Sequence, residues 1–183
     1  KPIEKEGDPQ QQELLNRLIK PFVLRRKKTD VLRELPEKVE ETCFCDLSPQ
    51  QQELYTDTLT RRRDALLANL TRPDSPIPYL HIFSLLSQLK QICNDPALFL
   101  KQEENYQDYT SGKWELFVEL LHEALESNQK VIVFSQFLGM LDIIEAYLTS
   151  KKIRFAGIRG ATQDRQKQLE RFQKDPKCLV FVG

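Results

Sequence analysis

The residues with the best claim to chemistry lie in a loop at positions 157–162, near the C-terminus. Arg159 and Arg165 belong to a group of arginines around this loop, and Gly160 can bring its backbone close to a ligand. Thr162 stands where a helix is expected to begin, and the free N–H groups of a helix start suit a phosphate oxygen. These residues alone favour a β-to-α turn with a good cap and nothing bound, and an anion contact is the other interpretation.

The spacing of residues does not support a metal site, a phosphate loop or a nucleophilic serine. Cys43 and Cys45 are two apart, and with Cys93, Cys178 and two histidines they make no paired CxxC or HxxxH pattern of a metal site. The phosphate loop GxxxxGK[ST] does not occur, and Ser135 lacks the glycine-flanked elbow that exposes a hydrolase serine. On spacing alone, the chain has no complete active site.

Three short apolar runs and two helical patterns must position the loop 157–162 and a second loop at 135–136. The first run, 131–134, is continuous and rich in β-branched residues, which is typical of a strand covered by helices on both faces. The order strand, helix, strand, helix, strand predicts parallel β-α-β units, whose functional loops lie at the carboxyl ends of the strands. The expected strands are 131–134, 153–158 and 178–182, the expected helices are 137–149 and, with Thr162 as N-cap, 163–174, and the loops are 135–136 and 157–162.

The part of the chain before these strands reads mainly as helices. Residues 38–47 alternate between apolar and polar side chains, which predicts a half-buried strand at a sheet edge. The polar stretch 101–110 is expected to be mobile. Helices are expected at 10–24 with a break at Pro21, at 49–70 after the cap Ser48, at 79–93, and from Ser111 to Ser127. The predicted class is therefore α/β, with two long helices inserted between an edge strand and the parallel core.

Composition and charge describe an ordinary soluble protein. Of the 183 residues, 40% are hydrophobic and 30% charged, and 27 basic side chains face 27 acidic ones, so any nucleic-acid surface must be local. Four cysteines make no disulfide framework in a chain of this length, which favours a reducing, intracellular compartment. No signal peptide or membrane-spanning run is present. Because Lys1 is not a methionine and position 183 directly follows a strand, we expect a piece of a longer protein.

A series of short sequence blocks runs in order through the chain from about Lys20. The blocks are LRRKKTDV at 24–31 with LPEKVE at 35–40, LSPQQQELY at 47–55, LKQICNDPAL at 89–98, SGK at 111–113, VIVFSQF at 131–137 and RGATQDR at 159–165. Together they resemble the SWI/SNF-type helicase-like ATPases, the chromatin-remodelling branch of helicase superfamily two. Two positions depart from the family pattern. Arg159 replaces the usual Asp and is expected to alter a phosphate contact, whereas Asp95 replaces the usual His and is expected to affect only helix-end packing.

The resemblance implies that the chain is most of a second RecA-like lobe, with a mainly parallel β-sheet flanked by helices. Residues 1–38 would be an inter-lobe linker with brace-like helices, and 39–183 the lobe, incomplete at its C-terminus, with a helical protrusion at about 48–110. In the family, ATP and Mg2+ bind between two lobes, and hydrolysis moves the motor along double-stranded DNA. The phosphate loop of the first lobe and the arginine fingers of motif VI are not in this sequence, so the chain alone is expected not to be catalytic.

The resemblance also implies a set of site residues and partners. The DNA contacts would be to the backbone, so they would position DNA without reading its sequence. Expected partners are double-stranded DNA, the first RecA-like lobe and proteins that bind the helical protrusion, with no metal site and no membrane. The protein would be located in the cytoplasm or nucleoid of a bacterium, or in the nucleus of a eukaryote. The DNA-contacting set is Ser135, Gln136, Arg159, Gly160, Ala161, Thr162 and Arg165, and the inter-lobe hinge set is Arg25, Arg26, Lys28 and Asp30.

Two other functions are open at this point. The helices within 48–110 could dock a protein partner on an α/β scaffold that has no nucleic-acid role. The chain could also belong to a nucleotide-binding α/β enzyme of another family, although the missing phosphate loop argues against that.

Overall fold

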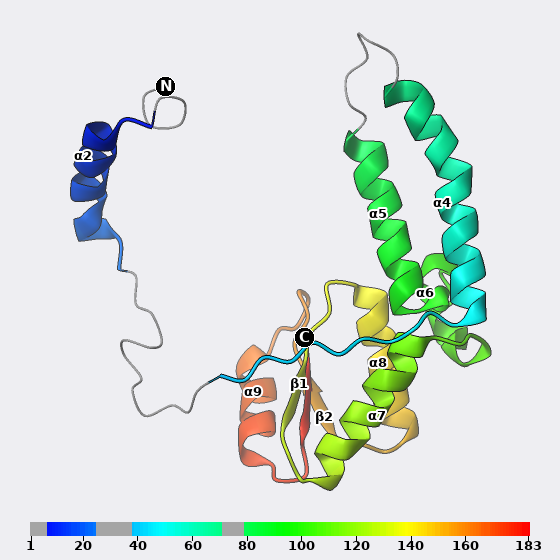
Figure 1. Ribbon diagram of the computed structural model, residues 1–183. Coiled ribbons are helices and arrows are strands. Elements are labelled where there is room, and N and C mark those ends of the chain that lie inside the picture. The colour runs from blue at the N-terminus through cyan, green and yellow to red at the C-terminus, as the bar shows by residue number, and fades with distance from the viewer. Residues whose placement is uncertain (1–6, 25–37, 71–78) are drawn as a thin grey trace. The chain divides into compact units, whose positions relative to one another are not determined.

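The computed structural model describes residues 7–24, 38–70 and 79–183, with 64–70 described by their backbone alone (Figure 1). The chain divides into two compact units, Lys1–Cys43 and Phe44–Gly183. Among the helices described, none combines the length and the apolar character that a membrane crossing requires.

The first unit contains one helix, α2 (Pro9–Ile19), within its described part. The carboxylate of Asp8 caps α2 by accepting a hydrogen bond from Gln10 N at 2.9 Å. A single 3-10 turn, η1 (Lys20–Phe22), follows and contains Pro21. Because proline has no N–H to continue an α-helix, the expected break at Pro21 is confirmed.

The second unit begins with a pair of helices, α4 (Pro49–Leu70) and α5 (Tyr79–Asn94), which run side by side (Figure 1). A capping box starts α4, as the sequence predicts. Ser48 Oγ accepts from Gln51 N at 3.1 Å, and Gln51 Oε1 accepts in return from Ser48 N at 3.0 Å. Near the end of α5, Leu89 and Ile92 are buried where the pair joins the rest of the unit.

A three-stranded parallel sheet follows, in the order β1-β3-β2. Its strands are β1 (Val131–Val133), β2 (Phe155–Gly157) and β3 (Val180–Val182). Ile132 pairs with Phe181, and Phe181 pairs with Ala156. The crossover helices are α8 (Leu138–Ser150) and α9 (Arg165–Lys174), which confirms the predicted parallel β-α-β units.

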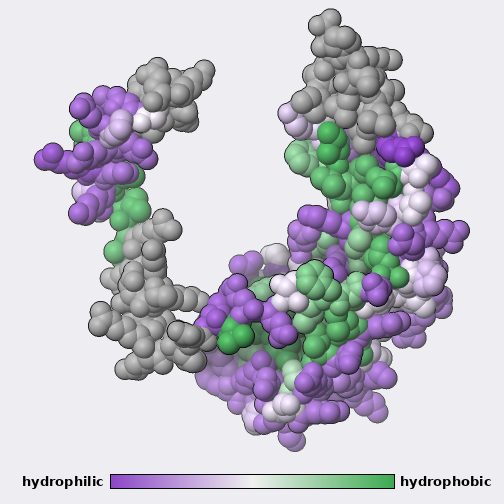
Figure 2. Space-filling view, viewed as in Figure 1, coloured by the Kyte–Doolittle hydropathy of each residue, from purple (hydrophilic) through white to green (hydrophobic). Residues whose placement is uncertain are grey.

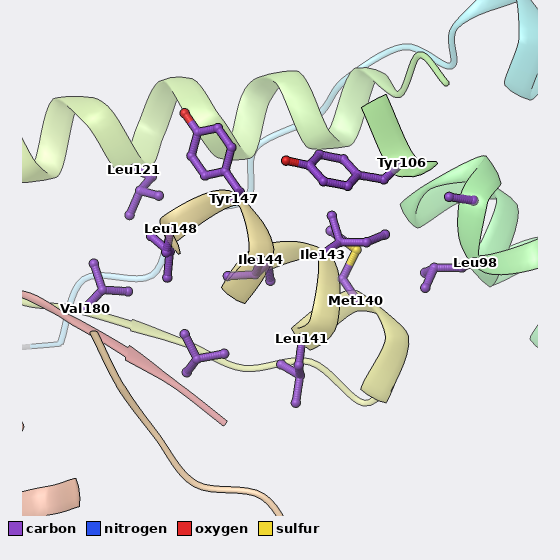
Figure 3. Close-up of a cluster of buried hydrophobic side chains, with 12 residues drawn as sticks. Leu98, Tyr106, Leu121, Met140, Leu141, Ile143, Ile144, Tyr147, Leu148 and Val180 are labelled. Atoms are coloured by element: carbon purple, nitrogen blue, oxygen red, sulfur yellow. The ribbon is translucent and has the colours of Figure 1, made fainter. Parts of the chain in front are cut away.

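Helices cover both faces of this sheet (Figure 1). On one face, Val180 and Val182 pack against α8, which is covered in turn by α7 (Gly112–Glu126). Figure 3 shows this core, with side chains from α8, α7, β3 and the short helix α6 (Pro96–Leu100) pointing toward one another. On the other face, Phe181 lies against Phe172 of α9, with ring centroids 5.4 Å apart. The central strand β3 is therefore buried, whereas the edge strand β1 is covered only in part, since Ile132 is 55% exposed.

Two sequence expectations are wrong in this region. Residues 38–47 form no strand, and Val39 and Phe44 are 87% and 89% exposed. An alternating pattern forms a strand only where one face is buried and a neighbour completes the hydrogen bonds, and the described sheet provides neither.

The polar stretch 101–110 is not the mobile loop that was expected. It contains the 3-10 segment η2 (Glu103–Asp108), and Tyr106 within it is only 6% exposed. The Tyr106 ring packs edge-to-face on Trp114 of α7, with centroids 5.5 Å apart. One buried aromatic residue therefore holds a segment whose other side chains are mostly polar.

Candidate functional site

The two predicted loops, 135–136 and 157–162, lie at the same edge of the sheet, where the strands have their carboxyl ends. Ser135 N, just after β1, donates to Gly183 O at 3.1 Å, and Ile158 N, just after β2, donates to Val182 O at 3.0 Å. Both loops thus continue the hydrogen-bonding pattern of the central strand β3. Since neighbouring strands lie about 5 Å apart, the two loops leave the sheet roughly 10 Å from each other.

The second loop is a closed turn over residues 159–162. Thr162 Oγ1 accepts from Arg159 N at 2.8 Å, and Thr162 N donates to Arg159 O at 3.0 Å. Thr162 is therefore not the N-cap of the following helix, as the sequence had suggested. Asp164 holds that position, where its carboxylate accepts from Lys167 N at 3.2 Å, and α9 begins at Arg165.

The tip of this turn is open to solvent and carries hydrogen-bond donors. Gly160 and Ala161 are exposed, and their N–H groups make no hydrogen bond to any described residue. The Thr162 hydroxyl accepts from the backbone, so its hydrogen is free to donate outward. Arg165 reaches back over the turn and donates to Gly160 O at 3.4 Å. Backbone N–H, hydroxyl and guanidinium groups together can bind a phosphate oxygen.

Gly160 is not required by the fold. A methyl group at this position would meet no atom within 4 Å, and the backbone φ of Gly160 is not in the left-handed region. Glycine at the turn therefore matters only if something outside the chain approaches it closely.

Arg159 points away from the tip and is held by α8. Its Nε and Nη2 lie 3.1 and 2.9 Å from the two carboxylate oxygens of Glu145, and its Nη1 lies 2.5 Å from Asp142 Oδ1. Partial burial acts to lower the pKa of Arg159, but the hydrogen bonds with these two carboxylates outweigh it and raise the pKa above its ordinary value. Arg159, which stands where the sequence analysis expected Asp, thus ties the turn to α8 through ion pairs with two carboxylates and one hydrogen bond to each of them.

Sequence reasoning missed the role of Asp142 and Glu145. Their spacing of three places them one above the other on the polar side of α8. That spacing was visible in the sequence, but their partner comes from a loop beyond the end of the helix. Only the crossover from α8 into β2 brings the three charges together.

In the first loop, 135–136, one of the two predicted DNA-contacting residues, Ser135, hydrogen-bonds to the chain itself. Ser135 Oγ accepts from Phe137 N at 3.1 Å at the start of α8. Gln136 is exposed and lines a hollow of about 380 Å³ between the end of α5 and this loop. Lys90 and Lys113 line the same hollow, and Lys113 Nζ donates to Asn94 Oδ1 at 3.1 Å. This part of the edge is therefore locally basic, although the whole chain is neutral.

A buried glutamine joins the helical pair to the lobe next to this hollow. Gln51 is completely buried; its Nε2 donates to Ile92 O at 2.8 Å, and its Oε1 accepts from Gly112 N at 3.1 Å. Ser111, the N-cap of α7, donates to Asn94 O at 2.8 Å. The ends of α4, α5 and α7 thus share one hydrogen-bond network.

Asp95 lies buried beside this network as the N-cap of α6. Its Oδ1 accepts from Ala97 N at 2.9 Å, whereas Oδ2 has no hydrogen-bond partner. Burial raises the pKa of this carboxyl to about 6, and the hydrogen bond from Ala97 opposes the rise only in part. Asp95 thus takes part in packing at a helix end, as expected, and its carboxyl group also has a raised pKa.

The remaining predicted residues lie outside the described part of the chain. These are the hinge residues Arg25, Arg26, Lys28 and Asp30. Within 7–24, 38–70 and 79–183, no group of three or more His, Cys, Asp or Glu side chains is arranged to hold a metal ion.

Comparison with known proteins relates this geometry to a family. The model of the SNF2-related domain matches residues 1–98, and the model of the helicase conserved C-terminal domain matches residues 112–183. The human SWI/SNF-related matrix-associated actin-dependent regulator of chromatin subfamily A member 1 is 33% identical over 186 residues, covering 96% of this chain and 17% of the human protein.

Solved structures of archaeal relatives have the same fold. The Sulfolobus solfataricus SWI2/SNF2 ATPase core in complex with dsDNA aligns with a TM-score of 0.66 and 30% identity, covering 97% of this chain and 38% of that one. The C-terminal domain of a Sulfolobus solfataricus SWI2/SNF2 ATPase also aligns with a TM-score of 0.66, at 27% identity, covering 80% of this chain and 63% of that one.

The chain spans about a sixth of the length of the human relative. Its parallel sheet, with helices on both faces and an added pair of long helices, is the RecA-like arrangement of the archaeal ATPase cores. The SNF2-related model alone matches more than half of the chain. The chain therefore belongs to the SWI/SNF-type helicase-like ATPases of helicase superfamily two.

Proposed function

We propose that this chain is part of an ATP-dependent translocase on double-stranded DNA, in which it supplies backbone contacts to one DNA strand. The turn 159–162 carries the proposal, because its outward N–H and hydroxyl donors lie next to Arg165 at an open strand edge. The archaeal ATPase core whose structure was solved with dsDNA supports the choice of ligand. The proposed contacts are Ser135, Gln136, Arg159, Gly160, Ala161, Thr162 and Arg165.

The residues of this set would act in different ways. Gly160, Ala161, Thr162 and Arg165 would donate to phosphate oxygens directly. Arg159, whose guanidinium is paired with two carboxylates of α8, would hold the turn in place. Such contacts position DNA without distinguishing its sequence, as a translocase that moves over all sequences requires.

ATP chemistry would reside mainly in other parts of the full-length protein. ATP and Mg2+ in such a motor supply the phosphoryl transfer that drives movement. The sequence of this chain contains no phosphate loop, so we propose that residues 39–183 form the second lobe with a protrusion at about 48–110, and that residues 1–38 link it to the first lobe. The chain alone would not hydrolyse ATP, and the motor would work where the DNA is, in the nucleoid or the nucleus.

Binding of a short fluorescent duplex, followed by anisotropy at low and high salt, tests the DNA contact. Gly160→Ala adds a methyl group where the fold has room, so weaker binding with an unchanged melting temperature would place DNA against the turn. Arg165→Gln removes one phosphate contact and should reduce the slope of log affinity against log salt by about one. Gln129→Ala, at the opposite end of β1, serves as the matched control and should bind as the wild type does.

Two results would contradict the proposal. Equal affinity of the wild type, Gly160→Ala and Arg165→Gln would mean that DNA does not contact the turn. A full-length protein whose ATP hydrolysis is not stimulated by duplex DNA would contradict the motor function itself.

A second candidate function is protein binding by α4 and α5. Leu80 and Phe83 of α5 are 84% and 62% exposed, and such apolar surface commonly marks an interaction site. Figure 2 shows hydrophobic residues gathered along this helix. A wild-type chain that binds no duplex even at low salt would favour this function over the first.

A further inference from the structure

A hollow of about 530 Å³ lies along β2 in the second unit and reaches the turn 159–162, because Arg159 and Thr162 are among its lining residues. We call it the β2 trough. Glu145 and Thr149 of α8 line one side, Gln168 and Arg171 of α9 line the other, and Lys152 and Arg154 lie at the start of β2. Because α8 and α9 cover opposite faces of the sheet, the edge of β2 forms the floor between them (Figure 1).

β2 is an edge strand of the described sheet, since it pairs only with β3. Ile158 N bonds to Val182 O on the β3 side. In a parallel strand, alternate residues direct their backbone groups to opposite sides, so Phe155 and Gly157 direct theirs into the trough. Gly157 N meets only the side chain of Gln168, at 3.4 Å, which is long for a hydrogen bond. The floor therefore offers backbone donors and acceptors that another strand could pair with.

The side chains that line the trough carry more positive than negative charge. Four cationic side chains line it, at positions 152, 154, 159 and 171, against the single carboxylate of Glu145. Arg159 already neutralises Glu145, and Arg154 has a loose partner in Asp175 at 3.6 Å. Lys152 and Arg171 are exposed and form no ion pair with any described residue. An incoming carboxylate would thus meet two uncompensated cations.

We propose that the β2 trough binds an extended, acidic polypeptide segment, which adds to the sheet as a strand beside β2. Main-chain pairing with Phe155 and Gly157 would supply affinity, and carboxylates near Lys152 and Arg171 would supply selectivity. A nucleic-acid strand would satisfy the cations but has no peptide groups to pair with the strand edge. The polypeptide uses both features, and this inference does not depend on a DNA contact at the turn.

The probe is a synthetic peptide of alternating valine and glutamate, titrated into the 15N-labelled chain and followed by amide chemical shifts. We expect saturable shifts at Phe155, Gly157 and Arg171. Lys152→Glu combined with Arg171→Glu should weaken binding by about tenfold or more, because two attractive contacts become repulsive. Lys167→Glu, on α9 but outside the trough, is the matched charge control and should bind normally. A peptide with a central proline, which lacks one N–H, should bind more weakly.

Several outcomes would overturn the proposal. One is an absence of shifts in the trough, and another is equal binding of a valine–lysine peptide. Shifts at Phe155 and Gly157 that grow with protein concentration alone would identify a second copy of the chain as the occupant. Trough shifts that appear with a short duplex, and are abolished by the Lys152→Glu and Arg171→Glu pair, would identify nucleic acid instead.

Discussion

Replacing Asp95 by Asn should remove most of the pH dependence that this residue gives to stability. Asp95 is completely buried, and burial raises the pKa of its carboxyl from an ordinary 3.8 to about 6. Between those two values the native state binds more protons than the unfolded chain, so the free energy of unfolding falls as pH rises. Each pKa unit corresponds to about 1.4 kcal/mol, which makes the full penalty of ionisation about 3 kcal/mol, roughly half of it between pH 5 and 8.

Asn preserves the geometry while removing the charge. Its side-chain oxygen can still accept from Ala97 N, because Asn is as good an N-cap as Asp. The amide replaces Oδ2, which has no partner, and an unsatisfied N–H there costs about 1–3 kcal/mol at every pH. The free energy of unfolding of the variant can therefore be higher or lower than that of the wild type. The prediction concerns only its dependence on pH, which should be lost.

Urea unfolding at a series of pH values between 5 and 8 measures this effect. Trp114, the only tryptophan, packs against Tyr106 and Tyr147 and reports on the core near this site. The difference in the free energy of unfolding between wild type and Asp95→Asn should change by about 1.5 kcal/mol from pH 5 to pH 8. The change favours the variant at high pH. Parallel pH profiles for the two proteins would refute the conclusion that Asp95 is a buried carboxyl with a raised pKa.

Three further substitutions probe the packing around the site. Gln51→Leu should lower the free energy of unfolding by about 3 kcal/mol, measured by urea unfolding, because it leaves several buried backbone groups unpaired; a cost below 1 kcal/mol would contradict the network. Gly112→Ala places a methyl carbon 2.0 Å from Asp46 O, so thermal melting should reveal a loss of about 2 kcal/mol or more, and an unchanged melting temperature would disprove this close approach. Arg159→Gln removes the partly exposed pair with Glu145 and should cost only about 1 kcal/mol at low salt and less at high salt; a large, salt-independent loss would show a different role.

Much of the fold could be predicted because its signals are local. The continuous apolar run 131–133 does form a strand, and the order of strands and helices predicts the parallel pairing that is observed. The expectation that helices cover this strand on both faces is wrong, because β1 lies at an edge of the described sheet and Ile132 is 55% exposed. The capping box at Ser48 likewise depends only on residues within one turn of a helix. The ordered family blocks pointed to the loop at 159–162, although they did not indicate how its side chains are arranged.

What the sequence by itself determined is most of the helices, the three parallel strands and the family to which the chain belongs. Tertiary structure alone decided that Arg159 pairs with α8 and that β2 lies at an edge with a positive trough beside it. The physical reason is the range of the interactions involved. Apolar periodicity and capping act between near neighbours along the chain, whereas a charge finds its partner, and a strand its edge, only once distant segments have packed together.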